Sequence, residues 1–289
     1  MPTPSLAALP VRRLTHRDLT ACADLSEDRG WPREERKWGL LLSAGQGYGI
    51  DDPAGGLVAA CVVTAYGPSD RPALGAVGMV LVAERHARQG VGRRLMRHIV
   101  STMGPTTPLT LHATPNGRPL YEELGFKVTG RAEMVCGHFS PDGPPSDIVT
   151  RPATAEDLPS ILRLDEEVFG ADRTHMITRL PAFADQLRIA EDNGRIIGYA
   201  AAWPNMATHV VGPLIARDTE TAKALLASLA ARTDRPLRTD IDVRHEELLA
   251  WVKARGLESV AFNAVMNLGI ADLPGDWSRR FAPLTVAAG

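Results

Sequence analysis

The chain has 289 residues, a length that predicts about two domains. Hydrophobic residues make up 44% and charged residues 23% of it, an ordinary globular composition that excludes wholesale disorder. The 32 Lys and Arg residues nearly balance the 34 Asp and Glu residues, and the net charge of −2 excludes a generally basic nucleic-acid-binding chain.

The sequence contains no run of 18 apolar residues, and residues 1–10 lack the basic start and the apolar stretch of a signal peptide. The three cysteines, Cys22, Cys61 and Cys136, are widely spaced, and the eight His residues are scattered. We therefore expect a cytoplasmic protein with no membrane association, no disulfide framework and no bound metal, in which the cysteines are small buried hydrophobic residues.

The hydrophobic pattern predicts a succession of strands and helices over the first half of the chain. Strands are expected near 11–14, 47–51, 56–66, 74–82, 109–113 and 126–135, and helices near 18–27, 33–43, 91–102 and 117–124. In the helix near 91–102, Val91, Leu95 and Ile99 share one face. This order favours an α/β fold with a mixed sheet flanked by helices.

The two halves of the chain share short patterns, which indicates an internal repeat. Thr15 and Thr154 each follow a short strand and precede an Asp three residues later, a capping-box arrangement. Residues 77–82 resemble residues 211–216, and both read as buried strands that lead into a helix. Residues 137–147 contain three Pro and two Gly, so we predict a linker there and two domains, 1–140 and 141–289.

Residues 80–96 carry the most informative pattern: an apolar strand, a basic turn with Gly90 and Gly92, and an amphipathic helix. The first N–H groups of a helix have no intrahelical partner, and the helix dipole makes that end positive, so this turn is suited to a phosphate. The P-loop pattern is absent, and Leu95 stands where a dinucleotide fingerprint needs its third glycine. The alternative is an ordinary glycine turn beside a solvated basic helix.

This turn resembles the acetyl-CoA pyrophosphate loop of the GCN5-related N-acetyltransferases (GNATs), with Ala87 as a departure where that family has Gln or Arg. The resemblance implies that the backbone of Arg88, Gln89, Gly90, Val91, Gly92 and Arg93 binds the pyrophosphate of acetyl-CoA. It also implies that the pantetheine arm pairs with Val80, Leu81 and Val82. The implied fold is two tandem acetyltransferase-like domains, each a mixed, mostly antiparallel sheet flanked by helices.

A second GNAT-like motif follows at residues 116–126, where Asn116, Tyr121 and Phe126 have the family's spacing. The resemblance assigns Asn116 to cofactor binding and Tyr121 to catalysis. A Tyr hydroxyl near the thioester sulfur can act as the general acid that protonates the leaving thiolate. The alternative for Tyr121 is a ring that only packs on the core.

The sequence offers several candidates for the general base that accepts the proton of the amine. His112 has a suitable intrinsic pKa and faces opposite to Leu111 on its predicted strand, although a His bonded within the sheet is an alternative. Carboxylates in the loop at residues 26–38 are further candidates, as is a chain of water molecules. That loop contains Glu27, Asp28, Glu34, Trp31 and Trp38, which would either receive a cationic acceptor or form a solvated helix with packing Trp side chains.

The second half lacks the features of the predicted site. Where the first half has its glycines, Asp218 and Glu220 stand at the helix start, and their negative charge opposes a pyrophosphate. Trp251 stands near the counterpart of Tyr121 and offers no comparable acid. This half resembles the non-catalytic C-terminal domain of tandem GNAT proteins, and we expect it to line the acceptor pocket or complete the sheet.

Taken together, the sequence predicts an N-acetyltransferase that moves an acetyl group from acetyl-CoA to a primary amine by direct attack in a ternary complex. The acceptor is expected to be a small-molecule amine, without nucleic-acid or membrane partners, and the oligomeric state is left open. The alternative is an acyl-CoA-binding sensor without turnover.

Overall fold

The computed structural model describes residues 6–141 and 147–289, and it contains two compact units. Unit 1 comprises the chain up to Lys127 together with Met266–Ala271 and Ala288, and unit 2 comprises Val128–Val265, Asp272–Ala287 and Gly289. Part of the predicted linker at 137–147 lies outside the described residues. A compact unit is not the same thing as a folding domain, so the boundary between residues 140 and 141 stays a prediction.

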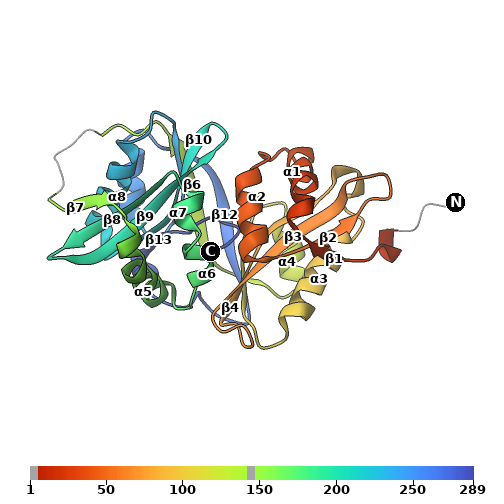
Figure 1. Cartoon of the computed structure of the whole chain (residues 1–289). Helices are drawn as coiled ribbons and strands as arrows, with labels where there is room; N and C mark the ends of the chain where they lie inside the picture. The colour runs from red at the N-terminus through yellow and green to blue at the C-terminus, as the bar shows by residue number, and fades with distance from the viewer. Residues whose placement is uncertain (1–5, 142–146) are drawn as a thin grey trace. The chain divides into compact units, whose positions relative to one another are not determined.

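The strands of unit 1 follow the order β1-β2-β3-β4-β5 (Figure 1). Their bounds are Arg12–Leu14, Gln46–Asp51, Leu57–Tyr66, Leu74–Val82 and Leu109–Ala113. Neighbouring strands are antiparallel except β4 and β5, which are parallel. The predicted mixed, mostly antiparallel sheet is therefore confirmed in this unit.

Helices cover both faces of this sheet. The helices are α1 (Leu19–Asp28), α2 (Glu35–Ala44), α3 (Val91–Met103) and α4 (Arg118–Glu123). A Cβ atom on Gly75 of β4 would contact Met103 of α3 and Val63 of β3, which places α3 on the Val63 face. A Cβ atom on Gly45, directly after α2, would instead lie against Val62 and Thr64. Because successive side chains of a strand point to opposite faces, α2 covers the other face.

Unit 2 repeats this pattern of strands. Their order is β12-β6-β11-β10-β9-β8-β7, and β13 pairs with β10. The bounds are β6 Lys127–Gly137, β7 Val149–Pro152, β8 Gln186–Asp192, β9 Arg195–Asn205, β10 Thr208–Ala216, β11 Leu237–Asp242, β12 Glu258–Leu268 and β13 Arg280–Ala282. Antiparallel pairs again surround one parallel pair, here β10 with β11, which confirms the predicted internal repeat.

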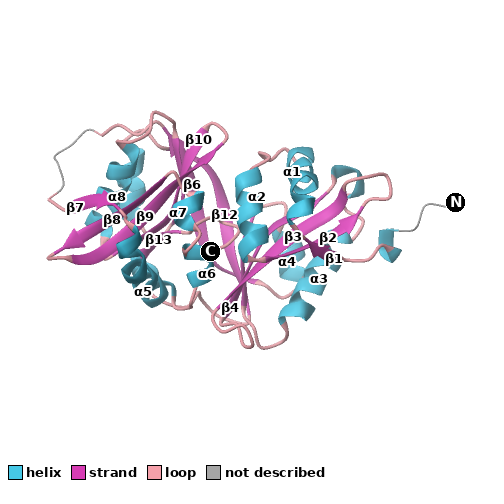
Figure 2. Cartoon of the chain, viewed as in Figure 1, coloured by secondary structure: helices cyan, strands magenta, loops and turns pink. Residues whose placement is uncertain are grey.

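The helices of unit 2 also cover both faces of the sheet (Figure 2). They are α5 (Leu158–Phe169), α6 (Thr174–Ile177), α7 (Leu180–Phe183), α8 (Thr219–Ala230) and α9 (Glu246–Lys253). Ala200 of β9 shares a buried apolar cluster with Leu225 of α8. The next residue back, Tyr199, donates its hydroxyl hydrogen bond to Asp165 of α5. Neighbouring side chains of β9 therefore point to opposite faces of the sheet, one face covered by α8 and the other by α5.

Both predicted capping boxes are confirmed. Asp18 accepts a hydrogen bond from the backbone N–H of Thr15 at 2.8 Å, and Asp157 accepts one from Thr154 at 2.7 Å. Each box begins a 3₁₀ turn, His16–Asp18 or Ala155–Asp157, that leads directly into α1 or α5. The repeated motif thus fixes how the first helix of each unit starts.

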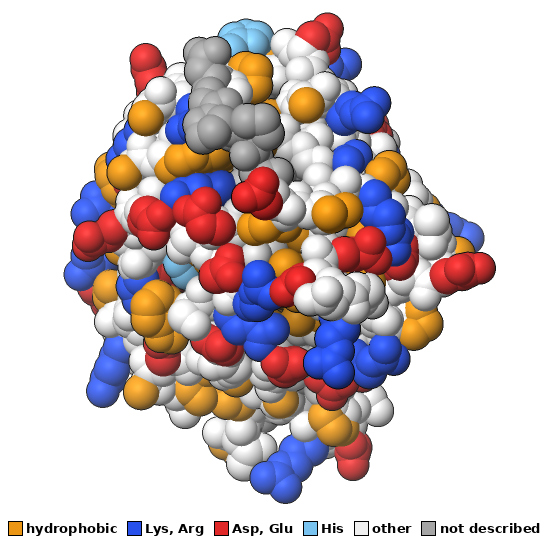
Figure 3. Space-filling model, turned by 90° about the vertical axis from the view of Figure 1, so that its left-hand side faces the viewer, with side chains coloured by type: hydrophobic (Ala, Val, Ile, Leu, Met, Phe, Trp, Pro, Cys, Tyr) orange, Lys and Arg blue, Asp and Glu red, His pale blue; other side chains and the backbone are white. Residues whose placement is uncertain are grey.

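Surface charges of both signs are intermixed over the face of the molecule that Figure 3 shows. In unit 2, Arg151 pairs with Asp157 and Glu191, each at 2.7 Å. Arg217 pairs with Asp192 at 2.6 Å in the same unit. Within the described residues, we find no helix with the length and apolarity needed to cross a membrane.

Candidate active site

The turn that opens α3 has the conformation that its glycines allow. Gly90 precedes the helix with φ of +78°, a left-handed conformation that glycine adopts without strain. A Cβ atom there would meet nothing within 4 Å, and Arg88, Gln89 and Gly90 are exposed. In the described part of the chain, no side chain caps the start of α3. The first turn of this helix is therefore available to an anion.

Gly92 has a different role from Gly90. A Cβ atom on Gly92 would lie 3.4 Å from both Val82 Cγ2 and Leu120 Cδ2, so the glycine lets α3 pack closely on β4 and α4. The predicted apolar face of α3 is confirmed, since Val91, Leu95 and Ile99 are buried.

A buried carboxylate, Asp52, holds the basic turn in place. It accepts hydrogen bonds from Arg85 Nη2 and His86 Nε2, each at 2.7 Å, and from the N–H of Ala54 at 2.8 Å. Burial alone would raise the pKa of Asp52, but these donors outweigh it and lower the pKa to about 2. Sequence analysis did not identify Asp52, because no local pattern links a residue to partners more than 30 positions away.

The arginines of this turn divide into paired and unpaired groups. Arg93 pairs with Glu123 of α4 at 2.5 Å, and Arg85 is held by Asp52. Arg88 is exposed and has no hydrogen-bond partner among residues 6–141 and 147–289. Arg88 thus carries positive charge that is not neutralised beside the open helix start.

Strands β4 and β5 separate next to this turn. Their ladder joins Gly75–Val77 to Leu109–Leu111 and ends there, whereas β4 continues to Val82. A bulge after Gly78 changes the register between β3 and β4, and Met79 has a positive φ of +52°. The backbone of Val80, Leu81 and Val82 therefore lies beyond the end of the parallel ladder, as an extra extended strand would require.

Tyr121 of α4 is 7% exposed and lies on the α3 side of the sheet, since Leu120 beside it contacts the start of α3. Its ring packs edge-on against Phe126. The hydroxyl makes no hydrogen bond with any residue that the structure describes, although buried Tyr hydroxyls usually find a partner. Burial, with a smaller contribution from Cys61, raises the pKa of Tyr121 above its ordinary value, so the hydroxyl keeps its proton at neutral pH.

The structure places His112 away from Tyr121, whereas Asn116 directly precedes Gly117, where a Cβ atom would lie 3.1 Å from Tyr121 Cε2. Leu109 of β5 faces α3, so alternation directs half-buried His112 to the opposite face of the sheet. Asn116 is exposed in the turn before α4. The roles of His112 and Asn116 remain predictions.

The acidic loop before α2 is occupied by its own contacts. Trp38 is fully buried and donates a hydrogen bond to Ser26 Oγ at 2.9 Å, which is a packing role. Glu34 pairs with Lys37, and Glu27 pairs with Arg33 at 3.0 Å. Asp28 accepts a hydrogen bond from the N–H of Glu84 at 2.7 Å, so it helps to hold the turn after β4. Trp31 is 38% exposed.

Unit 2 differs from unit 1 at each matching position. Asp218 caps α8 and accepts hydrogen bonds from Thr221 N at 2.8 Å and Thr221 Oγ1 at 2.7 Å. This side chain occupies the helix start that is uncapped in α3. Trp251 packs against Phe139, with ring centroids 5.3 Å apart, and beneath Arg255.

The short strand β13 occupies the place where β10 and β11 separate. The parallel pairing of β10 with β11 ends at Val210, and β13 then pairs with Leu214 and Ile215. In the internal repeat these two residues correspond to Val80 and Leu81. The backbone edge that is open in unit 1 is therefore paired with the chain's own residues in unit 2.

The described residues contain no cluster of His, Cys, Asp and Glu that fits a metal ion. The site geometry rests instead on backbone groups, arginines and one tyrosine.

Comparisons with known proteins agree with this architecture. Residues 66–138 and residues 161–282 match two family profiles, each described as "Acetyltransferase (GNAT) domain". The uncharacterized N-acetyltransferase YitH of Bacillus subtilis (strain 168) is 28% identical over 222 residues, which cover 76% of this chain and 77% of YitH.

Solved structures show the same fold over the whole chain. One from Pyrococcus horikoshii has a TM-score of 0.81 at 18% identity and covers 100% of this chain and 99% of its own. A tandem GNAT protein from the clavulanic acid biosynthesis pathway has a TM-score of 0.65 at 14% identity, with coverage of 90% and 98%. With two matched acetyltransferase regions and two repeated units, the chain belongs to the GNAT family as a tandem member.

Proposed function

We propose that unit 1 transfers an acetyl group from acetyl-CoA to a primary amine in a ternary complex. The observation that carries this proposal is the open edge of β4 beside the uncapped start of α3, where a Cβ atom on Gly92 would lie 3.4 Å from Val82 Cγ2. The unbonded hydroxyl of Tyr121, in the helix whose Leu120 also lies beside Gly92, is the third feature. Each of the three features fits a different part of the same cosubstrate. Membership of a family of N-acetyltransferases supports the general activity.

Several groups of this chain would hold the cosubstrate. The backbone from Arg88 to Arg93 would bind the pyrophosphate, and the cationic side chain of Arg88 would add electrostatic attraction. The backbone of Val80–Val82 would pair with the pantetheine amides as a neighbouring strand does. Bound acetyl-CoA would supply the thioester that an amine nucleophile attacks.

The chain's own groups then carry the proton transfers. Tyr121 would donate its phenolic proton to the sulfur as the carbon–sulfur bond breaks, since a phenol carries its proton at neutral pH. The N–H of Val82 would donate a hydrogen bond to the acyl oxygen, where negative charge develops. The proton lost by the amine would go to water or to a carboxylate of the acidic loop. His112, on the sheet face away from Tyr121, would accept it only from an amine that approaches from that face.

We further propose that unit 2 neither binds acetyl-CoA nor transfers an acetyl group. Asp218 caps the helix that would face the pyrophosphate, and β13 occupies the backbone edge that would pair with pantetheine. Trp251 offers no proton donor comparable to Tyr121.

The test is release of free thiol when the full chain is mixed with acetyl-CoA and a panel of primary amines. Replacing Tyr121 by Phe should lower kcat about 10²- to 10⁴-fold with little change in acetyl-CoA affinity, because the proton donor is lost but the cavity keeps its shape. Tyr48→Phe is the matched control, since that buried hydroxyl bonds to Gln46 at 2.8 Å instead.

Three outcomes separate the possibilities. Unchanged turnover in Tyr121→Phe would refute the role of the tyrosine. Tight acetyl-CoA binding without thiol release for any amine would favour an acyl-CoA sensor. No acetyl-CoA binding by the folded protein would refute the proposed function as a whole.

A further inference from the structure

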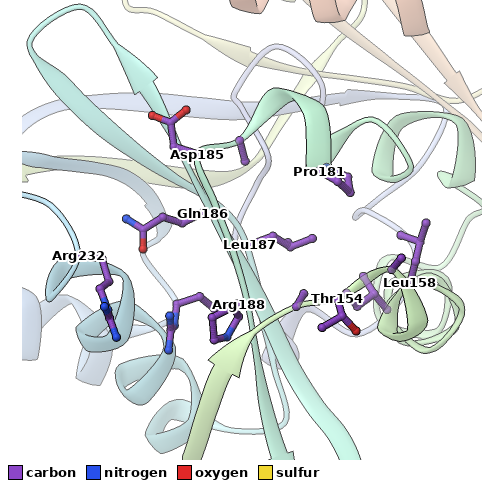
Figure 4. A pocket seen from close by; sticks show the side chains of 13 residues that line it. Thr154, Leu158, Pro181, Asp185, Gln186, Leu187, Arg188 and Arg232 are labelled. Carbon is purple, nitrogen blue, oxygen red and sulfur yellow. The ribbon is translucent and has the colours of Figure 1, made fainter.

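Unit 2 contains a cavity that the proposed acetyl transfer does not use (Figure 4). Its volume is about 600 Å³, and it lies at the edge of β8 where β7 ends. Pro152, the last residue of β7, pairs with Arg188, and beyond it the backbone of Ala153 bonds to Leu187 O at 2.8 Å. The cavity is therefore bounded by a strand edge that β7 does not extend far enough to cover.

Arg188 is a buried cation at this cavity. The residue is 8% exposed, and its fully buried Nε has no hydrogen-bond partner among the residues that the structure describes. No ion pair of its guanidinium group is found within those residues. Burying a charge without a partner costs several kcal/mol, so charged side chains at this depth are normally paired. A bound anion would supply the hydrogen-bond acceptor and the negative charge that Arg188 lacks.

The surroundings of Arg188 add to this deficit of negative charge. Arg232 also lines the cavity, and Figure 4 shows it on the same side of β8 as Arg188. Burial, and then the charge of Arg232, lower the pKa of Arg188. Gln186 lies two residues from Arg188 on the same strand face, and as a neutral amide whose Nε2 donates to Leu229 O at 3.4 Å it supplies no negative charge there.

The carboxylate among the lining residues, Asp185, lies away from Arg188. Asp185 stands at the opposite end in Figure 4, and its Oδ2 contacts His209 Nε2 at 3.3 Å. The remaining lining is largely apolar and includes Ile161 of α5. Leu187 of β8 and Leu158 of α5 lie across the edge of β8 from Arg188 and Arg232 in Figure 4, since neighbouring side chains of a strand point to opposite faces. One end of the cavity thus attracts negative charge, and the wall beyond it suits hydrocarbon.

We propose that this cavity binds a small organic oxyanion, a carboxylate or a phosphate ester. Arg188 and Arg232 hold the oxyanion through charge-assisted hydrogen bonds, which are the strongest that a neutral-pH protein offers to such a group. The apolar part of the ligand contacts Leu187 and its neighbours. The site is separate from the predicted acetyl-CoA site in unit 1, and it does not depend on the proposed function.

The experiment titrates the full chain with two probes, benzoate and inorganic phosphate, at constant ionic strength. Binding is followed by calorimetry and by the NMR signal of the Arg188 Nε–H group, assigned by comparison with Arg188→Gln. The wild type should bind at least one probe saturably and shift that signal. The preferred probe shows whether the site takes a carboxylate or a phosphate.

Arg188→Gln should weaken the preferred probe about 10- to 100-fold, because a hydrogen bond to a charged group is lost. Arg195→Gln is the matched control, an exposed arginine of the same unit, and it should bind like the wild type. Arg232→Gln changes an exposed side chain, so it gives a second test if Arg188→Gln fails to fold. Phosphate bound at the α3 turn would persist in every one of these variants.

Two results would overturn the proposal. One is the absence of saturable binding of both probes to the wild type. The other is equal affinity of the preferred probe for the wild type and for Arg188→Gln, or for Arg232→Gln where the first variant does not fold.

Discussion

Asp52 shows how one buried carboxylate can organise a loop that carries little hydrophobic surface. It joins β2 to the basic turn after β4, through Arg85, His86 and the backbone of Ala54. The turn contributes exposed arginines and glycines, which provide few apolar contacts of their own. Its conformation therefore depends on polar contacts to Asp52.

Asp52→Asn should reduce the free energy of unfolding by about 2 kcal/mol at pH 7, because charge-assisted hydrogen bonds are lost from a buried group. The folded-state pKa of Asp52 is lowered, so its stabilisation is present above the unfolded pKa of about 3.9. That stabilisation is lost as the pH falls toward about 2.

Urea unfolding of both proteins between pH 7 and pH 2 measures this contribution. The difference between wild type and Asp52→Asn should be constant from pH 7 to about 5 and shrink between about pH 4 and 2. A difference that stays constant down to pH 2 would contradict the assignment.

At the residue scale, the sequence predicts groups that belong to local motifs and misses groups that act at a distance. Gly90, Gly92 and Tyr121 stand in motifs of fixed spacing, and the structure places Gly92 beside Val82 at the end of β4 and beside Leu120 of the helix that carries Tyr121. Asp52 and Arg188 belong to no motif, because their importance comes from burial beside partners or neighbours far along the chain. The acidic loop also illustrates this limit, since only the fold shows that Trp38 is fully buried.

The elements themselves follow closely from the hydrophobic pattern. The strands at Leu74–Val82 and Leu109–Ala113 have the predicted bounds, and α3 extends one residue beyond its predicted end. Continuous apolar strands bounded by glycine, proline or charged turns give a clear signal. The bulge at Met79 and strand β13 were not predicted, because a three-residue strand has no period and a bulge depends on its partner strand.

The packing of α3 against β4 and α4 gives a prediction for the element. Gly92→Leu would place a branched side chain where Val82 and Leu120 are already in contact range, so α3 must move away from the end of β4. Overpacking of this kind costs about 1–3 kcal/mol. We also expect acetyl-CoA affinity to fall at least about tenfold, since the amides move with the helix.

Gly39→Leu in α2 is the matched control, because a Cβ atom there meets nothing within 4 Å. Thermal unfolding and calorimetric titration should show a stability near that of the wild type and unchanged affinity. If Gly92→Leu bound acetyl-CoA as tightly as the wild type, close packing of α3 would not be required for the site.

For the whole molecule, the repeated architecture alone would predict two acetyl-CoA sites. The capped helix and the paired strand edge of unit 2 lead us to expect one. We expect calorimetry to give one acetyl-CoA per chain, because Asp218 and β13 occupy the matching positions in unit 2. Gly92→Leu should then weaken all of the measured binding. A stoichiometry of two, or residual tight binding in that variant, would show that unit 2 binds the cosubstrate.

The tandem arrangement is visible in the sequence because the repeated Thr-to-Asp capping boxes and the two buried strands recur in the same order. The features from which we propose that the second copy is inactive are visible in the sequence only in part. The replacement of glycines by Asp218 and Glu220 indicates a changed helix start, but the closure of the strand edge depends on residues more than 60 positions later.

Strand β13 also gives the two units different expected changes in thermal stability when the concentration of acetyl-CoA changes. Because β13 is part of the polypeptide, it is present in every molecule. The sheet of unit 2 is therefore completed at any concentration of acetyl-CoA. A copy that relies on a diffusing partner gains stability only as that partner accumulates, by about 2.7 kcal/mol when its concentration is a hundred times the dissociation constant. If unit 1 binds acetyl-CoA as proposed, its resistance to heat should therefore rise with the concentration of that cosubstrate, whereas the resistance of unit 2 should not.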